Sequence, residues 1–218
     1  MLASLALMYS ALASPVHIAR CEATLPTVRH MPTDSSLLAM FESGQPYAEF
    51  LEGTKARREG WFEKNSVAQV DASLVARARV VGGKWKVLVV AIDACNDSMN
   101  SLPYIARLAD SVPGMELRVI LPEKGKPLQE SHRTLDGRAA TPTFLLIDEA
   151  GKEAGCIVEL PRELRHWTHA LRTSGKADEL SDGKRDFYER DRGRGITTEM
   201  VELLEAARDG APICDRGN

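Results

Sequence analysis

The sequence predicts an α/β domain in which helices cover a buried mixed sheet. The apolar run at 85–92 has strand length and no polar alternation, which is typical of a strand buried on both faces. Helical spacing at 95–110 and a second apolar run at 117–121 complete a β-α-β crossover with parallel strands. The runs at 143–147 and 155–160, joined by a short turn, predict an antiparallel hairpin.

Helices are expected on both sides of these strands. Apolar residues recur every three or four positions between 35 and 79, which predicts two or three short packing helices. Residues 127–135 predict a short helix, and a further helix is expected near 164–171. After a charged stretch, Thr197 and Thr198 are expected to cap a final helix whose apolar stripe packs back on the domain. The predicted organisation is a leader and linker at 1–33, the main domain with its N-terminal helices at 34–173, and a charged linker with a C-terminal helix at 174–218.

Composition narrows the classes of function. With 44% hydrophobic and 27% charged residues, the 218-residue chain has the composition of a soluble globular protein. The net charge of −3 gives no basic field for nucleic acid, and the mixed charges at 184–194 predict a solvated segment. No integral membrane segment is predicted, because the apolar run at 1–13 is too short to span a bilayer.

The same run at 1–13 has the length of a signal peptide, and Ala-Leu-Ala at 11–13 offers a cleavage site. However, no Lys or Arg precedes it. Export to a bacterial periplasm and a cytoplasmic location therefore both stay open.

A short motif follows the first buried strand directly. It reads Ala94-Cys95-Asn96-Asp97-Ser98, with Pro103 inside the following helix and Thr141-Pro142-Thr143 ahead of a later strand. These residues, in this order of elements, resemble the thioredoxin family, and within it a bacterial group with a Cys-x-Asp-Cys motif. The resemblance covers about 45–172. It implies a thioredoxin-like fold with a central mixed sheet of four to five strands and a cis-proline at Pro142. Ala94 replaces the family's aromatic residue, and Ser98 replaces its second cysteine.

The motif suggests thiol chemistry at Cys95. The unpaired N–H groups and dipole at a helix N-terminus favour the nucleophilic thiolate, and the Ser98 hydroxyl could donate to the sulfur. Asp93 and Asp97 act in the opposite direction. Because Ser98 cannot resolve a mixed disulfide, only an external thiol such as glutathione would release the product. This is monothiol exchange.

Partners and ligands follow from the same motif. The expected partners are client proteins or peptides carrying thiols or disulfides. Ala94, Thr141 and Pro142 are expected to align the substrate backbone, to which an extended peptide could pair. No bound cofactor is predicted. No metal site is predicted either, because His166 and His169 have no third ligand nearby.

Two functions from different classes stay open: a monothiol exchange enzyme, and a redox-inactive module that binds proteins or peptides in the same groove. A third interpretation makes Cys156 the resolving partner of Cys95, although a buried core cysteine is the expectation for Cys156. Cys21 and Cys214 could form a staple if the chain is exported.

Overall fold

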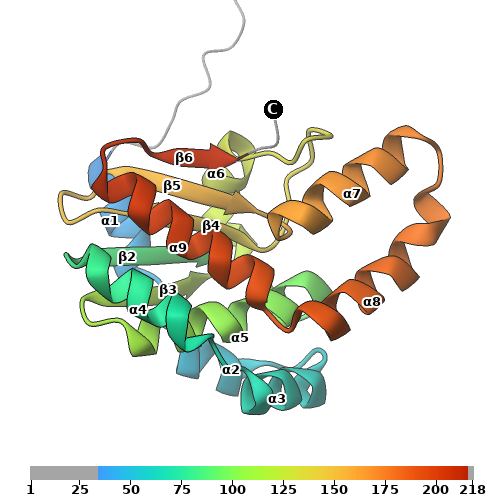
Figure 1. Cartoon of the computed structure of the whole chain (residues 1–218), viewed down its shortest axis with the longest axis horizontal. Coiled ribbons are helices and arrows are strands. Elements are labelled where there is room, and N and C mark those ends of the chain that lie inside the picture. The colour runs from blue at the N-terminus through green and yellow to red at the C-terminus, as the bar shows by residue number, and fades with distance from the viewer. Residues whose placement is uncertain (1–33, 216–218) are drawn as a thin grey trace, which may run out of the picture.

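The computed structural model describes residues 34–215, and Figure 1 shows their arrangement. The predicted leader and linker at 1–33, including Cys21, lie outside the described residues. Among the helices that are described, none is long and apolar enough to cross a membrane.

A mixed sheet forms the centre of the domain, in the order β1-β3-β2-β4-β5-β6. Strands β2 and β3 are parallel, as the crossover requires, and β4 runs antiparallel to both β2 and β5. Within residues 34–215 the sheet has six strands, one more than the upper prediction. They are β1 (Gln45–Pro46), β2 (Trp85–Val90), β3 (Met115–Ile120), β4 (Thr143–Ile147), β5 (Glu153–Val158) and β6 (Ile213–Asp215).

Helices cover both faces of this sheet, and its side chains alternate between two apolar cores. In Figure 1, helices α4, α5 and α9 lie in front of the sheet, and α1 and α6 lie behind it. The mixed α/β thioredoxin-like fold is thereby confirmed. The helices are α1 (Asp34–Glu42), α2 (Tyr47–Gly53), α3 (Arg58–Val67), α4 (Ala72–Val81), α5 (Asn96–Ser111), α6 (Pro122–Ser131), α7 (Arg162–Thr173), α8 (Leu180–Asp191) and α9 (Arg194–Arg208).

The region after α7 differs from the predicted charged linker. It forms a 3-10 turn at Ala177–Glu179 and then the helix α8. Arg192 and Gly193, both in the left-handed region with φ of 48° and 76°, turn the chain directly into α9. Thr197 therefore lies inside the first turn of α9 instead of capping it, and its hydroxyl donates to the Gly193 carbonyl at 2.7 Å.

Helix α6 also differs from its prediction. It begins at Pro122 and ends at Ser131, several residues before the predicted 127–135. Pro122 stands in the first turn, where its missing N–H costs no hydrogen bond. The prediction places the helix start at Pro127, because a proline fits the first turn of a helix. Pro122 fits that turn equally well, so the prolines alone do not fix where the helix begins.

A buried ion pair ties α7 to α9. Arg165 Nη2 lies 2.6 Å from Glu199 Oε1, and these side chains are 3% and 2% exposed. The other Glu199 oxygen accepts the backbone N–H of Arg162 at 2.9 Å. This pair fixes the C-terminal helix against the helix that follows the sheet.

Candidate active site

Cys95 caps the N-terminus of α5, directly after the loop that leaves β2. Its sulfur accepts a hydrogen bond from the backbone N–H of Ser98 at 3.4 Å. The thiol is unpaired and partly exposed, with the exposed residues Ala94 and Asn96 on either side. A sulfur held at a helix N-terminus and open to solvent can act as a nucleophile once ionised.

The Thr141–Pro142 segment, directly before β4, reaches the same end of the sheet. Its peptide bond is cis, and the thiol of Cys95 lies 3.2 Å from the Thr141 carbonyl oxygen, to which it donates. Strand β4, which follows, pairs Thr143 with Val90 at the end of β2. The sheet register therefore places Cys95 and Thr141 together, although 46 residues separate them in sequence.

Ser98 contacts the sulfur differently from the prediction. Its backbone N–H donates to Cys95, whereas its hydroxyl has no hydrogen-bond partner among the described residues. The Ser98 side chain is fully buried at the inner side of the motif.

Asp97 lies behind the motif, in contact with α8. Its carboxylate accepts from Lys184 Nζ at 2.5 Å and from the Tyr188 hydroxyl at 2.9 Å. Burial raises the pKa of Asp97 above its ordinary value, although the ammonium of Lys184 acts in the opposite direction. The sequence predicts a solvated Lys184, but its side chain is only 17% exposed because α8 packs on this end of α5.

Asp93 holds the loop ahead of Cys95. Its carboxylate accepts the backbone N–H groups of Lys55 and Ala56, both at 2.8 Å. Burial opposes ionisation of Asp93, but these backbone hydrogen bonds outweigh it and lower its pKa. The indole N–H of Trp61 on α3 donates to the Asp93 carbonyl at 2.8 Å, so α3 and the segment before it brace the motif. The carboxylates of Asp93 and Asp97 thus both accept hydrogen bonds from neighbouring donor groups.

The remaining described cysteines form a disulfide. Cys156 on β5 bonds to Cys214 on β6, with 4.4 Å between their Cα atoms. Cys156 is thus a bonded half-cystine and not the lone core cysteine of the prediction, and Cys214 pairs with it and not with Cys21. Cys156 packs in the core on the α1 and α6 side, whereas α5 packs on the opposite side of the sheet. It therefore does not resolve Cys95 in this structure.

The family model described as thioredoxin matches residues 44–174, more than half of the chain. The chain belongs to the thioredoxin family. Two solved structures are similar to it in fold. One is a protein of unknown function, PA1234, from Pseudomonas aeruginosa, with 19% identity, a TM-score of 0.57, and coverage of 77% of this chain and 96% of that one. The other is an HIV epitope-scaffold, with 18% identity, a TM-score of 0.58, and coverage of 78% and 97%. No match was found among curated proteins.

In this thioredoxin-family chain, a polar network braces the loop that leads to Pro142. Arg138 donates to Asp136 at 2.7 Å and to Glu159 at 2.9 Å. The backbone N–H of Glu159 in turn donates to the Pro142 carbonyl at 2.8 Å. The loop bearing Thr141 is therefore tied to the end of β5 through side chains as well as backbone.

Asp136 makes this brace sensitive to acid. Burial opposes its ionisation, but hydrogen bonds from Arg138 and Thr134 outweigh burial and lower its pKa to about 2. Because the folded value lies below the ordinary value of about 3.9, the stabilisation is present above about pH 4 and is lost as pH falls through about 2. We expect Asp136→Asn to lower the free energy of unfolding by about 1–2 kcal/mol at pH 7.

Urea unfolding at pH 7 and at pH 3 checks this expectation. The difference between the parent and the Asp136→Asn variant should shrink at pH 3, because below about pH 3.9 the Asp136 carboxyl takes up a proton in the unfolded parent while it stays mostly ionised in the folded parent, which favours unfolding. Asp182→Asn, at a side chain that is 77% exposed, is the matched control and should change stability little at either pH. An equal loss for Asp136→Asn at both pH values would contradict the assignment.

Proposed function

We propose that this thioredoxin-family protein catalyses monothiol thiol–disulfide exchange on protein or peptide disulfides with glutathione. One observation carries the proposal: the unpaired Cys95 thiol, partly exposed at the N-cap of α5, lies between the Ser98 N–H and the Thr141 carbonyl. The chemistry needs a reachable sulfur at a helix N-terminus beside free backbone that a substrate can pair with.

Two thiol-exchange steps complete the cycle. The Cys95 thiolate attacks the glutathione sulfur of a mixed disulfide, which forms a Cys95–glutathione disulfide and expels the client thiolate, which takes up a proton. A second glutathione, as its thiolate, then attacks this disulfide at the glutathione sulfur. It releases oxidised glutathione and restores Cys95. The net reaction converts one mixed disulfide and one glutathione into one client thiol and one glutathione disulfide, so atoms and electrons balance.

The surface around the motif suits an extended peptide. Ile92 and Leu121, at the carboxyl ends of β2 and β3, are 37% and 44% exposed. Ala94, in place of a bulky aromatic residue, leaves the approach to the sulfur open. Apolar groups beside a reactive thiol favour a peptide over a small polar substrate.

A peptide–glutathione mixed disulfide tests the proposal. In a Cys21→Ser background with Cys156 and Cys214 left oxidised, Cys95 is the single thiol. We expect intact-mass spectrometry to detect one glutathione adduct when free glutathione is omitted. With glutathione present, peptide thiol should appear in a catalysed reaction.

Cys95→Ser in the same background should reduce the rate to that without protein, since the nucleophile is lost. The protein that retains Cys21 should catalyse the reaction at the same rate as the Cys21→Ser protein. If no adduct forms, or if Cys95→Ser retains the parent's rate, exchange at Cys95 is refuted. The groove would then be assigned to peptide binding without chemistry.

A further inference from the structure

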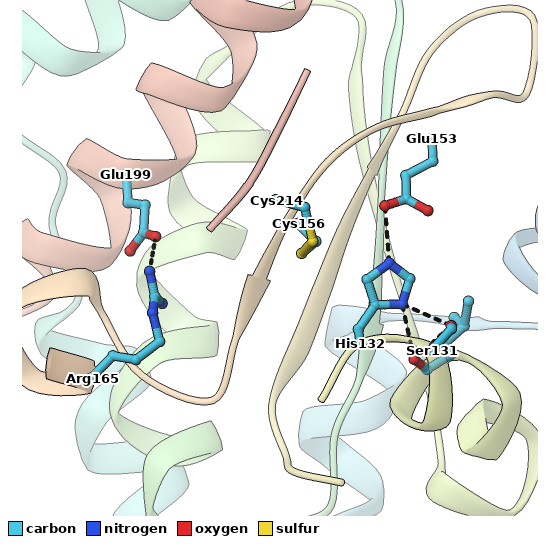
Figure 2. Close-up of a disulfide and its surroundings, with 8 residues drawn as sticks. Ser131, His132, Glu153, Cys156, Arg165, Glu199 and Cys214 are labelled. Atoms are coloured by element: carbon cyan, nitrogen blue, oxygen red, sulfur yellow. Dashed lines mark hydrogen bonds and ion pairs between the residues drawn. A yellow bond between two sulfur atoms is a disulfide. The ribbon is translucent and has the colours of Figure 1, made fainter. Parts of the chain in front are cut away.

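A second cluster of reactive groups lies on the sheet face opposite α5, away from Cys95. It consists of His132 at the end of α6, Cys156 on β5 and Cys214 on β6 (Figure 2). One ring nitrogen of His132 and the two sulfur atoms all lie within 4.8 Å of one another. His132 and Cys156 are fully buried. The exchange proposed for Cys95 uses none of these groups.

The hydrogen bonds of His132 define its two nitrogens. Nδ1 lies 2.9 Å from the Leu128 carbonyl oxygen and 3.0 Å from Ser131 Oγ. A carbonyl can only accept, so Nδ1 carries a hydrogen, which leaves Nε2 as the nitrogen that can bind a metal. Nε2 lies 2.9 Å from Glu153 Oε1. A histidine whose Nδ1–H is fixed by a backbone carbonyl is oriented as metal-binding histidines are.

A purely structural role for the Cys156–Cys214 disulfide does not explain why His132 and Glu153 lie beside it. Burying an imidazole costs desolvation, and a disulfide gains nothing from the imidazole or from the partly exposed Glu153 carboxylate beside it. A tetrahedral Zn²⁺ site needs Zn–S distances of about 2.3 Å and Zn–N distances of about 2.0–2.1 Å, which places its ligand atoms about 3.5–4 Å apart. The imidazole nitrogen lies within 4.8 Å of both sulfurs, and breaking the S–S bond lets the two sulfurs separate to the spacing that Zn²⁺ needs. Backbone pairing of Cys156 with Cys214 keeps both cysteines adjacent whether or not their sulfurs are bonded.

We propose that reduction of the Cys156–Cys214 disulfide converts this cluster into a Zn²⁺ site with His132 Nε2 and the two thiolates as ligands. A thiol reductant supplies two electrons and two protons, which break the S–S bond and give two thiols, while the reductant is oxidised to its disulfide. Binding of Zn²⁺ then displaces both thiol protons to solvent and replaces the contact between His132 Nε2 and Glu153. The fourth position takes a solvent oxygen. A small-molecule disulfide can then accept two electrons from the two thiolates: it is reduced to two thiols, the Cys156–Cys214 bond forms again, and Zn²⁺ is released.

Cobalt binding tests the site directly. In a Cys21→Ser, Cys95→Ser background, Cys156 and Cys214 are the only thiols. After anaerobic reduction and removal of the reductant, we expect one Co²⁺ per chain, with thiolate-to-cobalt charge-transfer bands and the visible bands of a tetrahedral site. Zn²⁺ should displace the Co²⁺. The oxidised form of the same protein should bind neither ion.

Variants separate this site from adventitious binding. His132→Gln should weaken Co²⁺ binding at least about tenfold, whereas His166→Gln, on the exposed side of α7, should not change it. Since His132 is buried, Cys214→Ser at the sheet edge provides a second variant, which should abolish the charge-transfer bands while circular dichroism stays that of the parent. Equal binding by the oxidised and reduced forms, or unchanged binding by both variants, would overturn the proposal. Because Cys95 is absent throughout, this result is independent of the exchange reaction.

Discussion

Glu199→Ala is expected to lower the free energy of unfolding by about 3–5 kcal/mol, since it leaves a buried guanidinium without its carboxylate. Arg165 and Glu199 are 3% and 2% exposed and lie 2.6 Å apart between α7 and α9. Because both side chains are buried, water cannot replace the lost carboxylate oxygens of Glu199. The backbone N–H of Arg162 would lose its Glu199 acceptor as well. Urea unfolding followed by circular dichroism measures the change.

An exposed pair between the same two helices provides the control. Arg162 Nη1 lies 2.8 Å from Glu202, and these side chains are 42% and 35% exposed. Solvent screens this pair, so Glu202→Ala should cost less than about 1 kcal/mol. Similar losses for the two variants would mean that burial does not set the energy of the Arg165–Glu199 pair.

Ser98→Cys is expected to convert the one-thiol motif into a dithiol that resolves its own mixed disulfide. Residues three apart on a helix have Cβ atoms about 5–6 Å apart, and the Ser98 backbone N–H already contacts the Cys95 sulfur. The introduced thiol attacks the Cys95 sulfur of the mixed disulfide, expels the bound thiol and leaves an intramolecular disulfide within the motif. An external dithiol then reduces it.

Release of a Cys95 adduct should therefore become independent of glutathione and at least about 100-fold faster than in the parent at low glutathione, because the attack is intramolecular. Stopped reactions analysed by intact mass measure the decay of the adduct. Ser98→Ala has a similar size and no thiol, and it should decay like the parent. If Ser98→Cys still needs external glutathione for release, the side chain at position 98 does not face the sulfur.

The sequence predicts the parts of the fold that have a strong pattern. The β2, β4 and β5 strands are apolar runs, and the crossover through α5 follows from the order of the elements. The edge strands β1 and β6 contain two and three residues, too few for any periodicity to appear. The mixed charges of α8 predict a solvated linker, although Lys184 and Tyr188 on this helix face Asp97.

The candidate site is predictable only where local sequence defines it. The motif at 94–98 and the Thr141–Pro142 segment stand out in the sequence, and the structure brings Cys95 and Thr141 into contact. The partners of Asp97 and the pairing of Cys156 with Cys214 depend on contacts between distant segments. His132 carries no local signal, because its neighbours on β5 and β6 follow it by more than twenty residues.

The short strand β6 also protects the sheet. It pairs in parallel with Gly155, Cys156 and Ile157, so it covers the outer edge of β5, and the Cys156–Cys214 bond holds it there. An uncovered edge strand offers unpaired N–H and C=O groups to any extended chain, including another copy of the same protein. The three-residue strand β6 thus protects the sheet against edge-to-edge aggregation.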